Sequence, residues 1–299
     1  MIVIKLWGGT GNQLFQYAFG YMLSKDNYDN LEFDTAFYKN QSTHVAKRFY
    51  VTKVIFPNFN FNYSFTRPKF LKIIENRYIS HAIRRLGGIY LKFPKYSLFI
   101  EKLRHFHPRI PYIKEKINYY DGYWQSAKYF EKYRKDLLEL FSPTERIINY
   151  VREWRASLPS ENIVGVHIRR GDYVKSNKPN KFLLGIEYYK NAIDILRGKL
   201  DSPLFCIFSD DIDWCRTQFP EIDDIIYVEN RVENGDIIDL FSIAACEHGI
   251  MSLSTFSWWG NWLRRNQNDA IVVYPEKVYF NEFFIPENWI CINKLMDRL

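Results

Sequence analysis

Several features that mark common protein classes are scarce in this chain of 299 residues. It has only four cysteines, none of them in a Cys-x-x-Cys pair, which argues against a structural zinc site and against a disulfide framework. Its six histidines lack metal-ligand spacing, so we expect no metal. No uninterrupted apolar stretch approaches the roughly 18 residues of a membrane-spanning helix. The first residues also lack the charged and apolar regions of a signal peptide, and these absences together favour a cytoplasmic protein.

The excess of positive over negative charge is small, but the positive residues are unevenly distributed along the chain. The formal net charge of +7 fits anionic partners without identifying one. Between Arg67 and Arg109 the chain has eleven Lys or Arg and only two acids, mixed with aromatic residues. Two interpretations stay open: a pair of surface helices around 81–106, or peripheral contact of residues 67–109 with a membrane or a lipid-linked glycan. We see no nucleic-acid recognition module, so we expect no nucleic acid as a partner.

The N-terminal half begins with a predicted strand at 2–6, a loop Gly8-Gly9-Thr10-Gly11 and a helix at 12–23. This order is typical of a phosphate cradle, but the loop has neither the Walker lysine nor the spacing of a dinucleotide fingerprint. The other elements predicted in this half are strands at 31–34 and 118–122, a helix at 129–141, and a helix capped by Ser142 that runs to 158.

From residue 159 onward, strands and helices alternate regularly. Polar residues around Pro159 mark a domain boundary, so we expect one domain at 1–158 and a second at 159–299. The strands predicted in the second domain cover 163–168, 204–208, 225–228, 249–252 and 270–274. Because helices separate these strands, the pattern predicts an α/β fold with a doubly wound parallel sheet.

Three polar clusters follow predicted strands of that sheet, at the edge where such folds bind ligands. They are Arg169-Arg170-Gly171-Asp172-Tyr173, Ser209-Asp210-Asp211 and Ser252-Leu253-Ser254-Thr255-Phe256-Ser257. Paired guanidiniums offer rigid donor forks that suit a diphosphate, although a surface pair bridged to neighbouring acids is the alternative. The third cluster opens a helix, whose N-terminal amides favour an anion. Together the clusters predict a sugar-nucleotide site.

Several residues have two interpretations. Asp211-Ile212-Asp213 could hold a divalent metal, or Asp213 could be an ordinary carboxylate at a helix start, which we favour. His167 fits a hydrogen-bonded core histidine as well as a nucleotide contact. The segment Trp258-Trp259-Gly260-Asn261-Trp262 fits packing between domains better than a sugar-stacking platform. Asn12 suits helix capping as well as donation to a sugar or a phosphate.

Five blocks of the chain resemble the motifs of a known family, in the same order. They are Gly8-Gly9-Thr10-Gly11-Asn12-Gln13-Leu14-Phe15-Gln16-Tyr17-Ala18, His167-Ile168-Arg169-Arg170-Gly171-Asp172-Tyr173, Phe208-Ser209-Asp210-Asp211, Ser254-Thr255-Phe256-Ser257-Trp258-Trp259-Gly260 and Ile285-Pro286-Glu287-Asn288-Trp289-Ile290. The family is that of the bacterial α-1,2-fucosyltransferases, glycosyltransferase family 11. Because the five matches are spread over nearly the whole chain and come in the same order, chance does not explain the resemblance.

The resemblance implies a GT-B type fold, with two Rossmann-like domains facing a cleft and the donor bound by the C-terminal one. It also implies GDP-L-fucose as the donor, no metal, and inversion at the anomeric carbon. Arg169 and Arg170 would hold the diphosphate, Asp172 is a candidate base, and Asn12 would position the acceptor or the fucose. The residues expected at the donor are His167, Arg169, Arg170, Ser209, Asp210, Asp211, Asp239, Ser254, Thr255, Phe256 and Ser257.

The sequence therefore predicts a cytoplasmic enzyme that transfers fucose from GDP-fucose to the 2-hydroxyl of a terminal galactoside in a surface glycan or an oligosaccharide. It has no other cofactor. The alternatives are a fucosyltransferase with another acceptor or linkage, and a non-catalytic nucleotide- or glycan-binding protein of the same fold.

Overall fold

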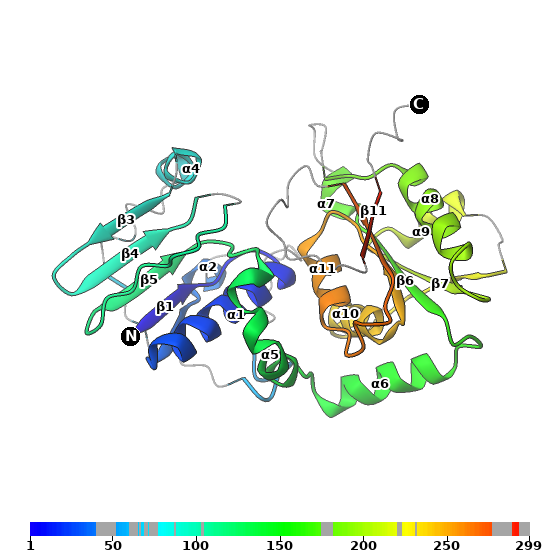
Figure 1. Ribbon diagram of the computed structural model, residues 1–299, viewed down its shortest axis with the longest axis horizontal. Coiled ribbons are helices and arrows are strands. Elements are labelled where there is room, and N and C mark those ends of the chain that lie inside the picture. The colour runs from blue at the N-terminus through cyan, green and yellow to red at the C-terminus, as the bar shows by residue number, and fades with distance from the viewer. Residues whose placement is uncertain are drawn as a thin grey trace. The chain divides into compact units, whose positions relative to one another are not determined.

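The computed structural model describes residues 1–39, 52–59, 65, 67–68, 71, 77–86, 88–102, 105–174, 182–219, 223–230, 232–276 and 289–292. The chain forms two compact units, which divide between Pro143 and Thr144 and which we call unit 1 and unit 2 (Figure 1). Each unit has its own β-sheet with helices packed on it, so the α/β class is confirmed. No helix of the described ranges is long and apolar enough to cross a bilayer.

Unit 1 contains a five-stranded sheet in the order β2-β1-β5-β4-β3. Its strands are β1 (Ile2–Lys5), β2 (Leu31–Asp34), β3 (Ile89–Lys92), β4 (Tyr96–Ile100) and β5 (Ile117–Asp121). Neighbouring strands are parallel except β3 and β4, which are antiparallel. Because β2 lies on one side of β1 and the later strands lie on the other, the carboxyl ends of β1 and β5 form a topological switch point.

Helix α1 (Thr10–Asn27) packs against the sheet of unit 1, as Figure 1 shows. Phe15 and Phe19 on its apolar face are fully buried, which accounts for the helical spacing of apolar residues in the sequence. Helix α5 begins only at Arg134, so the single helix predicted at 129–141 is instead a pair of 3₁₀ turns followed by an α-helix. The other described helical elements of unit 1 are α2 (Ala36–Lys39), α4 (Arg77–Leu86), α5 (Arg134–Leu140), and 3₁₀ turns at Ala127–Tyr129 and Glu131–Tyr133.

The pair of surface helices predicted around 81–106 is wrong. Helix α4 ends at Leu86, and the chain then forms the antiparallel pair β3 and β4. The aromatic and aliphatic residues of β4 pair in parallel with β5, and Leu98 and Ile100 are buried there, so cross-strand packing outweighs helix formation.

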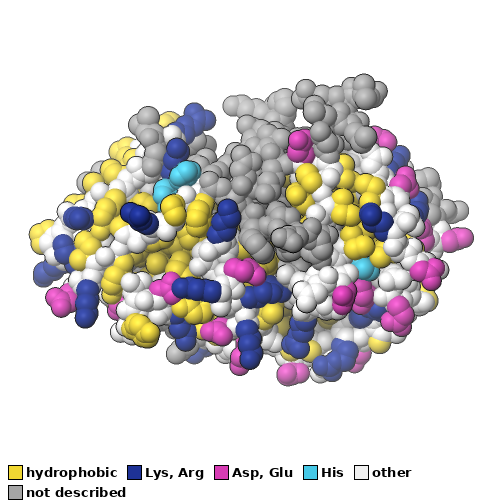
Figure 2. Space-filling view, viewed as in Figure 1, with side chains coloured by type: hydrophobic (Ala, Val, Ile, Leu, Met, Phe, Trp, Pro, Cys, Tyr) yellow, Lys and Arg dark blue, Asp and Glu magenta, His cyan; other side chains and the backbone are white. Residues whose placement is uncertain are grey.

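The same segment carries a mixture of basic and apolar side chains. In Figure 2 such side chains alternate over the visible face of unit 1. On α4, Tyr78 is 84% exposed and Ile79 43% exposed. Contact of residues 67–109 with a membrane stays a prediction.

The division between the units differs from the predicted boundary after Leu158. Helix α6 (Glu145–Ala156) packs on α10 (Gly235–Ala245) of unit 2, with Ile147 and Val151 buried. Its N-cap is Thr144 rather than the predicted Ser142. Because its apolar face is buried against unit 2, α6 belongs to that unit.

Unit 2 contains a six-stranded, wholly parallel sheet in the order β11-β10-β9-β6-β7-β8. The chain adds β7 and β8 on one side of β6, then crosses to add β9, β10 and β11 on the other, which confirms the doubly wound prediction. Strand β11 was not predicted. The strands are β6 (Ile163–Ile168), β7 (Leu204–Ser209), β8 (Ile225–Tyr227), β9 (His248–Ile250), β10 (Val272–Pro275) and β11 (Trp289–Ile292).

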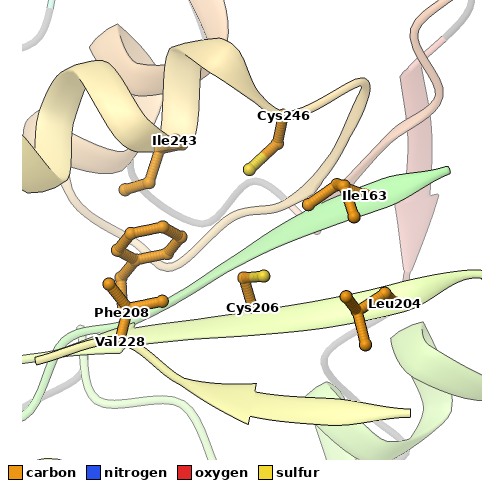
Figure 3. Packing of buried hydrophobic residues seen from close by; sticks show 7 residues of the cluster. All are labelled: Ile163, Leu204, Cys206, Phe208, Val228, Ile243 and Cys246. Atoms are coloured by element: carbon orange, nitrogen blue, oxygen red, sulfur yellow. The ribbon is translucent and has the colours of Figure 1, made fainter. Parts of the chain in front are cut away.

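Helices cover both faces of this sheet, α8 and α9 on one and α10 and α11 on the other (Figure 1). Beneath α10, the side chains of Ile243, Cys206 and Phe208 point toward one another in a cluster with four further apolar residues (Figure 3). This core fixes the strand ends that carry the polar clusters. The remaining described helices of unit 2 are α7 (Gly171–Val174), α8 (Ile186–Arg197), α9 (Ile212–Gln218) and α11 (Thr255–Trp262).

The three tryptophans of α11 are core residues. Trp258 and Trp259 are 0% exposed and Trp262 is 1% exposed, so no indole face is left for a sugar. Packing of these residues between domains stays a prediction. Next to them, Gly260 lies so close to Ile243 of α10 that a Cβ would approach the Ile243 Cγ2 to 2.7 Å. The β-branched isoleucine has little freedom to move away.

We therefore expect Gly260→Ala to be less stable than the matched variant Gly198→Ala, whose Cβ would meet only ordinary contacts at 3.6 Å. Both substitutions lower the conformational entropy of the unfolded chain by the same amount. The difference in their free energies of unfolding therefore measures overpacking, which typically costs about 1–3 kcal/mol. Urea unfolding of the two variants is the measurement, and equal midpoints would contradict the packing argument.

Candidate functional site

The predicted clusters of unit 2 meet at its topological switch point. Strands β6 and β9 are adjacent and parallel, so the residues that follow them emerge at the same edge of the sheet. There the Nδ1 atom of His167, on β6, lies 2.9 Å from the Oγ of Ser252, which follows β9. The backbone N–H of Ser252 in turn donates to the Oγ of Ser257 at 3.1 Å. Side chains therefore tie the two strand ends together.

Asp210 holds the arginine loop. Its Oδ1 accepts hydrogen bonds from the backbone N–H groups of Arg170 at 2.8 Å and Gly171 at 3.0 Å. Its Oδ2 lies 2.8 Å from Nη1 of Arg169, and both side chains are 28% exposed. A Cβ on Gly171 would lie too close to this carboxylate, so a larger residue there would displace the Asp210 side chain. Asp210 thus fixes both the backbone and the first guanidinium of the loop.

Arg170 is held by two other residues. Its Nε donates to Oδ2 of Asp211 at 3.0 Å, and its guanidinium carbon lies 3.4 Å from the centre of the Trp214 ring. The backbone N–H of Asp211 is fixed by the Oγ of Ser209 at 3.0 Å. Stacking on an aromatic face leaves the N–H donors at the guanidinium edge available for a planar acceptor. The sequence analysis missed Trp214, and its position one helical turn after Asp211 was the available signal.

The two carboxylates of the Asp-x-Asp segment make interactions that do not involve a metal. Asp211 pairs with Arg170. Asp213 is an exposed carboxylate in the first turn of α9, where its negative charge interacts favourably with the helix dipole. Over the ranges that the structure covers, no three His, Cys, Asp or Glu side chains group as metal ligands.

His167 is buried, with 6% exposure, and this burial lowers its pKa to about 4. The imidazole is therefore neutral near pH 7, hydrogen-bonded to Ser252 and 5.2 Å from the Phe256 ring centre. The hydrogen-bonded buried histidine is confirmed, whereas a contact with a nucleotide stays a prediction.

The start of α11 has an ordinary helix cap. The Oγ of Ser254 accepts from the backbone N–H of Phe256 at 3.3 Å. Ser257 is fully buried and serves the internal bond to Ser252, whereas Thr255 and Phe256 are partly exposed. Of the predicted contacts in this block, Ser254, Thr255 and Phe256 are partly exposed, and their contact with a ligand stays a prediction.

Asp239 lies apart from the arginine loop, in the second turn of α10. Its Oδ1 accepts from Nδ2 of Asn230, which follows β8, at 2.6 Å, and Asn230 accepts from the Tyr150 hydroxyl at 3.0 Å. Burial raises the pKa of Asp239 to about 7. Strand β8 is two places along the sheet from β6, so Asp239 marks a second point on the same edge.

The two remaining predicted residues are Asn12 and Asp172. Asn12 belongs to unit 1, near the start of α1, where its Oδ1 accepts from Nε2 of Gln125 at 2.8 Å. The backbone of Asp172 lies in α7, and its side chain is outside the described part of the chain.

The model of glycosyl transferase family 11 matches residues 99–293, which include the whole arginine loop and the α11 block. The chain belongs to glycosyl transferase family 11. An Escherichia coli α-1,2-colitosyltransferase is 31% identical over 98% of this chain and 99% of its own length. The O-antigen biosynthesis glycosyltransferase WbnK of Escherichia coli is 28% identical over 91% and 93%. The rat galactoside α-(1,2)-fucosyltransferase 2 is 28% identical over 58% of this chain and 53% of its own length.

Solved structures share the fold of this family member. The NodZ α-1,6-fucosyltransferase soaked with GDP-fucose superposes with a TM-score of 0.52 at 16% identity, over 88% of this chain and 91% of that chain. POFUT1 in complex with GDP gives a TM-score of 0.53 at 11% identity, over 91% and 97%. These similarities confirm the GT-B type fold.

We expect acid to destabilise the protein in part through His167. Its pKa is about 4 when folded and about 6.5 ordinarily, so between these values only the unfolded chain binds the proton and stability falls as pH falls. His167→Asn keeps a hydrogen-bonding atom near the Nδ1 position but cannot titrate. On going from about pH 7 to about pH 5 it should lose about 1–2 kcal/mol less stability than the parent in urea unfolding. Equal losses in both proteins would exclude a buried, neutral His167.

Proposed function

We propose that this family 11 enzyme transfers L-fucose from GDP-β-L-fucose to the 2-hydroxyl of a terminal galactoside, with inversion and without a metal. The observation that carries the proposal is the pair Arg169 and Arg170, held ready by Asp210, Asp211 and Trp214 at the switch point of unit 2. Two preorganised guanidiniums at that edge match a diphosphate in charge and in geometry.

The chemistry needs stabilisation of a leaving group. The acceptor oxygen forms a bond to the anomeric carbon, the bond from that carbon to the β-phosphate oxygen breaks, and GDP leaves with both electrons. Arg169 and Arg170 receive the developing negative charge without reorganising, since their positions are set beforehand. The hydroxyl proton needs a base, for which Asp172 is our candidate. Asp239 and His167 are proposed to bind the guanine, and Thr255 and Phe256 the phosphates.

Three relatives support the linkage and the biological setting. The colitosyltransferase and the rat fucosyltransferase are both named for α-1,2 transfer, and WbnK is named for O-antigen biosynthesis. We therefore propose a role in the cytoplasmic assembly of a surface glycan. A second donor is favoured by the colitosyltransferase itself, because it is 31% identical over nearly the whole chain. Colitose is fucose without its 3-hydroxyl group, so the two donors differ by one hydrogen-bonding group.

The test incubates the protein with GDP-fucose or GDP-colitose and a panel of β-galactosides, with and without EDTA, and identifies the product linkage by NMR. We expect an α-1,2-linked fucoside whose rate of formation does not change with EDTA. A preference for GDP-colitose would change the proposed donor but not the proposed linkage. Loss of activity with EDTA and recovery with manganese would overturn the metal-free proposal, and binding of GDP-fucose without release of GDP would indicate a non-catalytic binder.

Arg169→Ala and Arg170→Ala should each lower kcat by about 10²–10³-fold, the usual cost of losing one donor to a developing charge. Arg170→Lys should also be impaired, since lysine keeps the charge but loses the planar fork and the stacking on Trp214. The matched control is Arg197→Ala, which removes an Arg–Asp pair with Asp224 at the opposite edge of the sheet. Its kcat should stay within about twofold of the parent. Parent-like kcat in both arginine-loop variants would contradict the assignment.

A further inference from the structure

The loop that follows β5 in unit 1 is held more firmly than a simple connection requires. Glu101, which is 3% exposed, accepts hydrogen bonds from the backbone N–H groups of Tyr123 at 2.6 Å and Trp124 at 3.2 Å. Trp124 has a φ of 55°, and its buried ring stacks on Phe19 at 4.0 Å. A bulky residue stays in the left-handed region only where its surroundings impose it, and such positions gather at functional sites.

This loop is also tied to the loop after β1, across the switch point of unit 1. Nε2 of Gln16 lies 3.2 Å from the carbonyl oxygens of both Trp7 and Gly122. The indole Nε1 of Trp7 donates to the same Gly122 oxygen at 3.2 Å, and its ring stacks on Tyr123 at 4.0 Å. The two loops therefore form one rigid edge.

One side chain of the rigid loop reaches Asn12. Nε2 of Gln125 donates to Oδ1 of Asn12 at 2.8 Å. The other end of the Asn12 amide lies against Gly8, where a Cβ would be 2.6 Å from Nδ2. Gly8 has a φ of 83°, which also favours glycine. A glutamine amide can donate or accept; here Nε2 of Gln125 faces Asn12, so the two amides pair with Oδ1 of Asn12 turned toward position 125, whereas an apolar side chain there would form no such bond.

We infer that Gln125 is a positioning residue that fixes the side-chain amide of Asn12 in the orientation used for sugar transfer. This inference rests on the proposed function, in which Asn12 positions the acceptor or the fucose. If the Asn12 amide were rotated, Oδ1, an acceptor, would stand where Nδ2 would otherwise donate to a sugar oxygen. Transfer would then slow, although both substrates would still bind. The loop after β5, which is anchored by Glu101 and by Gln16, holds Gln125 in place for this contact with Asn12.

The first test is Gln125→Met, which keeps the length of the side chain and removes its amide. We expect kcat for fucose transfer to fall by about 10–100-fold, because small misplacements of a positioning group have effects of this size. The KM for GDP-fucose should not change, since the arginine loop is intact. In an Asn12→Ala background the same substitution should cause no further loss of kcat, because Gln125 acts through Asn12. Gln267→Met, which removes an amide that donates to the Trp262 carbonyl at 2.8 Å, is the matched control and should keep its kcat.

A second variant, Gln125→Glu, gives a signature that a merely structural role would not. The ionised carboxylate cannot donate to Asn12, whereas the protonated acid can. The kcat of this variant relative to the parent should therefore rise as the pH is lowered toward about 5. This variant also serves if Gln125→Met does not fold.

The outcomes separate the two claims. Losses of kcat from Gln125→Met and Asn12→Ala that multiply in the double variant, or a fully active Gln125→Met, would overturn the positioning role and leave the proposed function intact. A parent protein that transfers no sugar from GDP-fucose would overturn the proposed function and this inference with it.

Discussion

The carboxylate of Asp210 is the contact on which the candidate site depends. It accepts two backbone N–H groups from the turn after β6 and also pairs with the guanidinium of Arg169. Three donors around one carboxylate give the turn a single conformation, and the charge on the acid keeps the neighbouring cation partly neutralised until an anion arrives. In the proposed function, an anionic ligand would exchange one partner of the guanidinium for another rather than bind to a mobile side chain. This lowers the cost of ordering that a flexible arginine would impose.

The parallel sheet of unit 2 turns this local contact into a site. Strands β6 and β9 are neighbours although Ile168 and His248 are 80 positions apart in the chain. Their ends are joined by the buried His167–Ser252 hydrogen bond, and the next bond, from Ser252 to Ser257, sets the start of α11. A neutral imidazole suits this role, because a charged one would lie beside the guanidinium of Arg169, and that cation is one cause of the lowered pKa of His167.

Unit 1 also has a topological switch point, but with different chemistry. Its switch point also joins the loops after two parallel strands, but the side chains that join them are mainly amides and aromatic rings, with Gln16, Trp7 and Gln125 as examples. Neutral donors and acceptors of this kind suit hydroxyl groups, whereas the charged loop of unit 2 suits a diphosphate. The difference agrees with a division of labour between a sugar and a nucleotide, and it needs no change of fold.

The sequence by itself determined most of unit 2, because strands such as Ile163–Ile168 are rich in β-branched residues and are followed directly by charged residues and glycine. It also identified the arginines, the serine-rich helix start and the family. It did not determine β3 and β4, where aromatic residues without a clear period become strands only by pairing, β4 with β5 and β3 with β4. Nor did it show that Trp214 lies under Arg170, that Asp210 anchors a turn, or that Gln125 reaches Asn12 from 113 residues away. Those contacts join segments that are distant along the chain, and only the packing of strands and helices decides which of them meet.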